Sequence, residues 1–196
     1  MRDHLRRTRL TAVAVALGTA LLAGCASEAA EAPSESLPST SSPAPTTEAL
    51  PAVGPADFPV PPEARTKDAA GAEAFLRYWI DLLNRQRAIP AGQPLRDLGP
   101  DCQECLRIAT NYDDAAAVGS RYIGGEVSLV DVPSPIIEGD TAKFSFSARR
   151  EPVSLVDSAG TEIEGRAEVA PRLFSGLYLI WSTSTQSWLV TAFQLG

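Results

Sequence analysis

Prolines are concentrated in one stretch of this 196-residue chain, where nine of the 16 fall between residues 26 and 64. The stretch is otherwise dominated by Ser, Thr, Ala and Glu, and there is no Lys or Arg between Arg9 and Arg65. Proline interrupts helices and sheet ladders, and this stretch has little apolar surface to bury. We therefore expect residues 25–64 to be a disordered, partly polyproline II tether, and residues 65–196 to be the single folded domain.

The residues before the tether have the layout of an export signal. Four arginines precede residue 10, and residues 10–22 are uncharged and rich in Ala, Leu and Val. This run is shorter than the ~20 apolar residues of a membrane span and suits the hydrophobic region of a secretory signal. It ends in Leu22-Ala23-Gly24-Cys25, which resembles the bacterial lipobox. The resemblance implies that signal peptidase II recognises Leu22, Ala23 and Gly24, removes residues 1–24 and leaves an acylated Cys25.

A lipid on Cys25 would indicate that the protein is exported from the cytoplasm. We expect an exported protein, anchored by its lipid at the outer face of the cytoplasmic membrane. Two alternatives are an ordinary secretory cleavage after Ala20 or Ala23, and a twin-arginine export route suggested by Arg6 and Arg7.

Loss of the leader changes the charge of the chain. The whole chain has 17 basic and 24 acidic residues, a formal charge of −7. The leader takes four arginines and one aspartate with it, so 13 basic and 23 acidic residues remain, a balance of −10 with no histidine. We expect no nucleic-acid partner, because nucleic-acid binding needs a basic face. Without His, the usual nucleophile-activating and metal-ligating sets are incomplete, and we assign no catalytic residue, metal or cofactor.

Helical periodicity dominates the first half of the domain. Apolar residues from Ala72 to Leu83 recur at helical spacing, with a cap at Thr66 or Asp68 and an end before Pro90. A short turn is expected over residues 95–98. A second helix is expected over residues 101–118, and its buried face would hold Cys105, Leu106, Ala109, Tyr112 and Ala116.

Beyond Gly125 the apolar pattern changes to a period of two. Ala142, Phe144, Phe146 and Ala148 alternate with polar residues. Other strands are expected over residues 126–132, 153–156, 173–181 and 188–195, whereas residues 161–170 are not assigned. Helices followed by antiparallel strands indicate the α+β class, with two or three helices packed on a curved sheet of about four to six strands.

Several stretches of the domain together resemble an uncharacterised family of actinobacterial lipoproteins with a C-x-x-C-containing domain. They are Gly71-Ala72-Glu73-Ala74-Phe75-Leu76-Arg77-Tyr78-Trp79 with Leu83-Asn84, Pro94-Leu95-Arg96, Cys102-Gln103-Glu104-Cys105 and Trp188-Leu189-Val190. The order of elements is similar to the nuclear transport factor 2-like, or SnoaL-like, cone, in which helices close the open side of a bent sheet around a cavity. The resemblance implies a cell-envelope location and this fold; the family has no assigned activity, so the resemblance does not predict a reaction.

Cys102 and Cys105 remain as a pair if Cys25 carries the lipid. Thiols outside the cytoplasm tend to oxidise, and residues three apart at a helix start have Cα atoms ~5 Å apart, within the range of a disulfide. We expect a structural disulfide. A redox-active dithiol is the alternative, because a helix N-terminus lowers the pKa of a thiol.

Six aromatic residues are candidates either for lining a cavity at the mouth of the cone or for filling its core: Tyr78, Trp79, Tyr112, Tyr178, Trp181 and Trp188. A cavity lined by them would suit a small apolar ligand. The expected function is a non-catalytic, membrane-anchored envelope protein whose domain binds a partner protein or a small apolar ligand. The alternatives are an enzyme that uses the cavity without His, and a thiol-disulfide helper that acts through Cys102 and Cys105.

Overall fold

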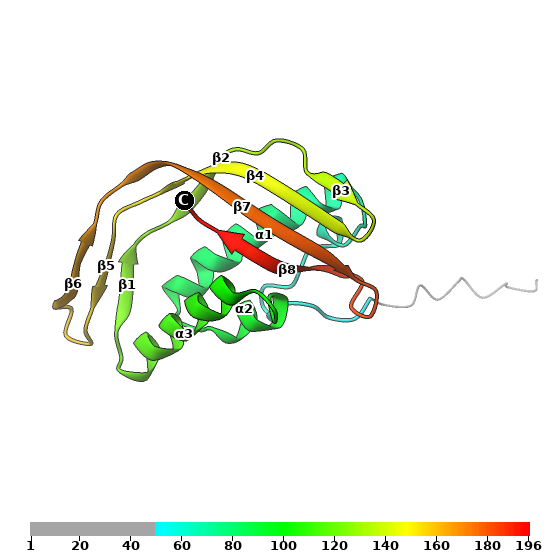
Figure 1. The fold of residues 1–196 in the computed structure, drawn as a ribbon. Coiled ribbons are helices and arrows are strands. Elements are labelled where there is room, and N and C mark those ends of the chain that lie inside the picture. The colour runs from blue at the N-terminus through cyan, green and yellow to red at the C-terminus, as the bar shows by residue number, and fades with distance from the viewer. Residues whose placement is uncertain (1–49) are drawn as a thin grey trace, which may run out of the picture. The chain divides into compact units, whose positions relative to one another are not determined.

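The computed structural model describes residues 50–196, except for the side chains of residues 164–167. The expected leader, its lipobox and Cys25 lie outside this range. Within it, three α-helices precede eight strands, and Figure 1 shows the helices under an arch of antiparallel sheet. The expected α+β class is confirmed. Among the described helices, none is long and apolar enough to cross a membrane.

The first helix, α1 (Ala69–Ala88), begins where the sequence predicts. The carboxylate of its N-cap, Asp68, accepts a 2.7 Å hydrogen bond from the N–H of Gly71. This bond satisfies a donor that has no partner within the first turn. The helix ends before Pro90, also as predicted.

Two more helices complete the helical layer. They are α2 (Gln93–Leu98), which replaces the expected short turn, and α3 (Gln103–Ala117). The buried face of α3 includes Cys105 and Ala109, as expected, but Ala115 is buried in place of Ala116.

The strands form two antiparallel sheets. The larger has the order β2-β4-β7-β8, with β3 beside β4, and the smaller has the order β1-β5-β6. The strands are β1 (Arg121–Gly124), β2 (Val127–Asp131), β3 (Ile136–Glu138), β4 (Thr141–Arg150), β5 (Val153–Val156), β6 (Glu162–Ala167), β7 (Ala170–Ser182) and β8 (Ser187–Gln194).

Three segments of the chain run through both sheets and bend between them. β1 leads into β2 through Gly124 and Gly125, β4 leads into β5 through Glu151 and Pro152, and β6 leads into β7. The two glycines have φ values of 73° and 80°, which residues with a side chain rarely adopt. Pro152 has no N–H to continue a ladder. The arch in Figure 1 follows from these bends, with β1, β5 and β6 at one end of it.

The core lies between the helices and the inner face of the larger sheet. Ala142, Phe144, Phe146 and Ala148 of β4 are all buried, as their alternation predicts. They belong to one apolar cluster that also includes Phe75, Leu76 and Trp79 of α1, Leu177 and Leu179 of β7, and Trp188 and Val190 of β8.

The described fold reaches further toward the N-terminus than residue 65. Residues 50–64, which we assigned to the tether, lie against the domain with Val53, Val60 and Ala64 buried. The ring of Phe58 stacks on that of Tyr78 with centroids 5.2 Å apart. These few apolar side chains pack on α1. Of the prolines in residues 50–64, only Pro62 belongs to a regular element, the short 3-10 helix Pro62–Ala64. The proline-based boundary at residue 65 is therefore wrong, because the described fold includes residues 50–64.

The strand pattern was predicted in part. The five strands of the larger sheet fall within the expected four to six, but the smaller sheet was not foreseen. Strand β1 was not assigned, and β6 lies in the stretch left open because it is rich in Glu and broken by Gly165. The three residues of β3 are all exposed, so no alternation marks them.

Candidate ligand-binding cavity

A cavity of about 260 Å³ lies among α1, α3 and the bend of the sheet. Its volume corresponds to roughly nine groups of the size of a water molecule. The apolar part of its wall consists of Leu83, Ile108, Val127, Val153, Phe193 and Leu195. The polar part consists of Arg87, Glu104, Arg107, Asn111, Tyr112, Tyr122 and Arg150, together with the backbone of Gly125.

Arg87 is a buried charge in this wall, with only 8% of its surface exposed. Its guanidinium donates hydrogen bonds to the carbonyl oxygen of Gly125 and, at 3.2 Å, to Oδ1 of Asn84. It also lies 3.5 Å from the carboxylate of Glu126. These contacts join the end of α1 to the bend of the sheet.

Arg150 is the last residue of β4 and lies opposite Val127 and Ala170 in the sheet register. Its Nε is buried and has no hydrogen-bond partner among the described residues. Its neighbour Arg149, by contrast, forms a 2.9 Å ion pair with Glu151. Arg150, which is half-buried, thus brings to the cavity a positive charge and one N–H donor, Nε, without an acceptor among the described residues.

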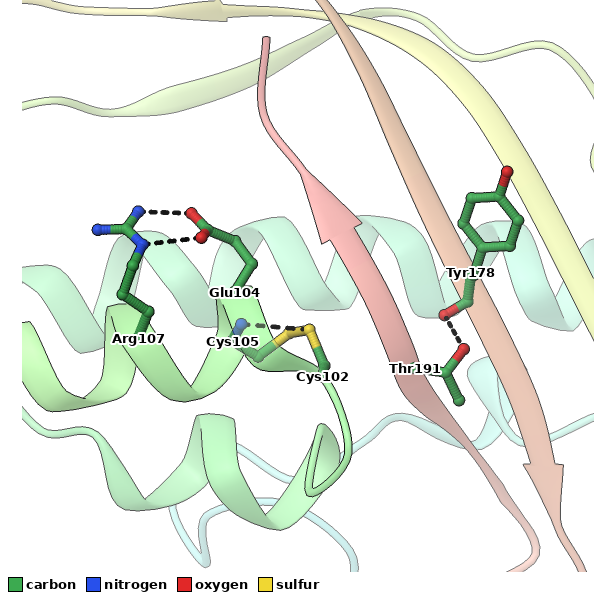
Figure 2. The surroundings of a disulfide bond; sticks show 6 residues. All are labelled: Cys102, Glu104, Cys105, Arg107, Tyr178 and Thr191. Atoms are coloured by element: carbon green, nitrogen blue, oxygen red, sulfur yellow. Dashed lines mark hydrogen bonds and ion pairs between the residues drawn. A yellow bond between two sulfur atoms is a disulfide. The ribbon is translucent and has the colours of Figure 1, made fainter.

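Glu104 and Arg107 form an ion pair in the cavity wall at the start of α3 (Figure 2). Two hydrogen bonds of 2.5 and 2.8 Å join the guanidinium to both carboxylate oxygens. These bonds hold the pKa of Glu104 below its ordinary value, so the glutamate is ionised at neutral pH. The pair is bidentate, which fixes both side chains.

Two tyrosines form the part of the wall between α3 and β1. The rings of Tyr112 and Tyr122 meet edge to face with centroids 5.5 Å apart. Burial raises the pKa of Tyr112 to about 12, an effect that the nearby charge of Arg87 opposes. The hydroxyl of Tyr112 therefore keeps its proton at neutral pH and is a hydrogen-bond donor.

A second hollow, of about 380 Å³, adjoins the cavity along α3. Asn111 and Tyr122 line both spaces, so the two lie side by side. The rest of its wall comes from the end of α3 and from β5 and β6, and includes Val118, Leu155 and Ile163.

The six predicted aromatic residues do not come together around one cavity. Tyr112 alone of the six lines the space described above. Trp79 and Trp188 are fully buried in the core, as the alternative interpretation held. Tyr78 is buried and its hydroxyl donates a 2.9 Å hydrogen bond to the carbonyl of Phe58. Trp181 meets Trp188 edge to face at 5.3 Å.

Tyr178 lies on the outer face of the larger sheet, away from the helices. There it borders a shallow hollow of about 510 Å³ whose lining also includes Ser145, Ser147, Phe174 and Gly176. Phe174 is 75% exposed and Tyr178 is 48% exposed. Alternate residues of a strand face opposite sides of a sheet, so these residues belong to the face opposite Leu177 and Leu179.

Cys102 and Cys105 are joined by a disulfide at the start of α3, with Cα atoms 5.2 Å apart (Figure 2). The sulfur of Cys102 accepts a 3.2 Å hydrogen bond from the N–H of Cys105, so the bridge also caps the helix. Both cysteines are fully buried. Thiol-disulfide exchange requires a thiolate to reach one of the sulfurs, so this burial argues against the redox alternative.

Sequence reasoning missed most of the cavity wall. For two residues of the wall, the sequence pattern could have indicated that they lie in the interior. Arg87 follows Leu83 by four positions on the apolar face of α1, and Arg150 follows Ala148 by two on the inward row of β4. A charged residue at a position where the pattern predicts a buried apolar residue indicates a functional site, or a site where other groups compensate the charge. For Ile108, Tyr122 and Phe193 no such signal exists, because a core residue and a cavity residue have the same periodicity.

Comparison with known proteins bears on the fold alone. No family model and no curated protein sequence matches the chain. Among solved structures, the intermembrane space region of chloroplast protein ARC6 is similar with a TM-score of 0.50 and 17% identity, over 66% of this chain and 97% of that one. An NTF2-like design has a TM-score of 0.39 and 11% identity, over 64% and 99%. A calcium/calmodulin dependent protein kinase II association domain from Xanthomonas campestris has a TM-score of 0.36 and 14% identity, over 66% and 87%.

Proposed function

We propose that this protein is a lipid-anchored component of the cell envelope whose domain binds a small, largely apolar ligand in the cavity between α1, α3 and the bent sheet. The observation that carries the proposal is the composition of the wall. Six apolar residues, among them Leu83, Ile108 and Phe193, offer apolar surface, and seven polar residues lie beside them. A concave site that combines apolar surface with convergent polar groups is typical of small-molecule sites.

The polar groups of the wall support binding over catalysis. Among the described residues of the wall there is one carboxylate, Glu104, and its two oxygens are engaged by Arg107. A general acid/base pair of carboxylates is therefore not formed by these residues. Fixed arginines and tyrosines can still orient a bound molecule.

A partner protein is the second candidate, and the outer face of the larger sheet favours it. Phe174, Tyr178 and Ile180 of β7 are exposed on that face, next to Ile136 of β3 across β4. Contiguous exposed apolar side chains often mark an interaction surface.

The lipid anchor is tested by Cys25→Ala. We expect the variant to lose its acyl modification and to leave the membrane fraction, because acylation needs the thiol. Detection of acylation by mass spectrometry and fractionation of cells measure both. A variant that stays acylated and membrane-bound would show that the lipobox assignment is wrong.

The ligand site is tested by filling the cavity. Ile108→Trp adds volume to the wall of the cavity and should abolish the fluorescence increase of a neutral, polarity-sensitive dye. Ile137→Trp places the same side chain on the exposed strand β3 and serves as the control. Thermal melts establish that both variants fold. The proposal fails if the dye does not bind the wild type, or if both variants bind it equally.

A further inference from the structure

Two arginines stand where the sequence pattern requires apolar residues, and both lead to the same cavity. Arg87 extends the buried stripe of α1, and Arg150 extends the inward row of β4. Their elements are far apart in the sequence, yet both side chains line the space beside Leu83 and Phe193. Arg87 is buried and Arg150 is half-buried, and burial of a charge is unfavourable unless something compensates it.

The compensation within the described chain is incomplete. Three arginines and one glutamate line the cavity, a net charge of +2 in a chain whose formal charge is −7. Glu104 is engaged by Arg107, and Glu126, the acidic partner of Arg87, is mostly exposed to solvent. Arg150 keeps a buried Nε without an acceptor among the described residues. An anion in the cavity would supply that acceptor.

We propose that the cavity binds an amphiphile with one anionic head and an aliphatic chain, an inference that rests on the proposed function and specifies its ligand. Arg150 and Arg107 hold the head by charge-assisted hydrogen bonds, and the hydroxyl of Tyr112 is a further donor nearby. The aliphatic chain lies along Leu83, Ile108 and Phe193.

The size of the site fits a short aliphatic chain as well as a head group. About 260 Å³ holds roughly nine water-sized groups, which is close to the size of a chain of ten carbons. A second hollow, lined by Val118, Leu155 and Ile163, lies beside the cavity. A neutral amphiphile would leave Nε of Arg150 without an acceptor, and a cationic one would meet three positive charges.

The test is calorimetric titration of the wild type with four ten-carbon probes below their micelle concentrations: decanoate, decyl phosphate, decanol and decylammonium. We expect the two anions to bind at least about tenfold more tightly than decanol, and decylammonium to bind most weakly. A preference between decanoate and decyl phosphate tells a fatty-acid head from a phospholipid-type head, and either preference supports the proposal.

Variants of the arginines identify which positive charge binds the anionic head. Arg150→Gln should weaken decanoate binding about tenfold and leave decanol binding unchanged, whereas Arg149→Gln, at the neighbouring position of the strand, should change neither. Glu104→Gln should strengthen decanoate binding, because it removes the competing carboxylate from Arg107. If Arg150→Gln folds poorly, Arg107→Gln takes its place, because it removes the other charge that holds the head. Arg150→Lys, which keeps the charge, is then the control.

The outcomes separate this inference from the function on which it rests. Equal affinities for decanol and decanoate, with no effect of Arg150→Gln, would overturn the anionic ligand and leave apolar-ligand binding intact. No binding of any probe or of the neutral dye to the wild type would overturn both.

Discussion

Asn84 joins α1 to the edge of the larger sheet through both ends of its side-chain amide. Its nitrogen donates a 2.8 Å hydrogen bond to the carbonyl of Val127, and its oxygen accepts one of 2.9 Å from the N–H of the same residue. Strand β2 is at the edge of its sheet, so the amide takes the place of a neighbouring strand. The same oxygen accepts from Arg87, which links this contact to the cavity.

Replacement of Asn84 should therefore lower the stability of the domain. We expect Asn84→Ala to lower the free energy of unfolding by about 2 kcal/mol, because two backbone groups of Val127 lose their partner. Arg77→Ala, which removes an exposed i,i+4 ion pair two turns earlier, should cost less than about 0.5 kcal/mol. Urea unfolding at pH 7 measures both, and similar losses would contradict the role given to the amide.

Asp113 makes the connection between α2 and α3 sensitive to pH. Its carboxylate accepts a 2.7 Å hydrogen bond from the N–H of Gly92 and a 2.5 Å bond from Arg96. The bond from Gly92 has the largest effect and holds the pKa of Asp113 below its ordinary value. Burial opposes it, and the hydrogen bond and the charge of Arg96 lower the pKa further. A folded-state pKa below the unfolded one stabilises the protein above the unfolded pKa, and this contribution is lost as the pH falls through the folded-state pKa.

We expect Asp113→Asn to lower stability at pH 7 and to have a much smaller effect at acidic pH, where the wild-type carboxylate is itself protonated. Urea unfolding of both proteins at pH 7 and near pH 2 gives the comparison. A loss of the same size at both pH values would mean that the charge of Asp113 is not the stabilising feature.

Much of the residue-level pattern could be predicted from the sequence, and the exceptions have physical causes. Alternation identified Phe144 and Phe146 as core, because one face of β4 meets only apolar neighbours. The contact of Asn84 with β2 could not be predicted, since the spacing of Asn84 along its helix does not show that β2 passes beside it. Burial of Arg87 depends on acceptors from Gly125 and Asn84 that no local pattern reveals.

At the scale of elements, the disulfide acts on the start of α3. Cys102 and Cys105 close a loop of four residues, and the chain-entropy estimate for so small a loop is about 2 kcal/mol. The bridge lies at the start of α3, with Glu104 and Arg107 near it on the same helix (Figure 2). It therefore positions the ion pair of the cavity as well as the helix.

We expect the double variant Cys102→Ser, Cys105→Ser to lose about 2 kcal/mol of stability and to remain folded. In the wild type, a thiol-specific reagent after mild reduction should detect Cys102 and Cys105 only when urea is present, because both are buried. Rapid reduction of the native protein would revive the redox alternative, and free thiols in the exported protein would contradict the disulfide.

Whole-molecule architecture follows from the bends in three strands and from the segment before α1. The bends at Gly125 and Pro152 turn one arch around the helices, and the space that remains under the arch is the cavity. A sequence shows such bends only as isolated Gly and Pro, so the smaller sheet was not predicted. We assigned residues 50–64 to the tether because they are rich in proline, and the sequence alone does not show that four apolar side chains among them pack on the domain.

Removal of residues 1–64 should accordingly destabilise the domain more than removal of residues 1–49. Val53 and Val60 each bury apolar surface with a contribution of about 2 kcal/mol, and Arg65 would lose its 2.8 Å hydrogen bond to the carbonyl of Pro51. We expect a difference of about 4 kcal/mol between the two truncated chains in urea unfolding. Equal stabilities would mean that residues 50–64 belong to the tether after all.

Binding of the ligand in the cavity under the arch can be observed by an NMR titration of the ¹⁵N-labelled domain with decanoate. We expect saturable shifts at the backbone amides of Leu83, Ile108, Tyr112, Val153 and Phe193, with little change at Phe174 and Tyr178. Shifts confined to Phe174, Tyr178 and their neighbours on the outer face of the sheet would contradict it.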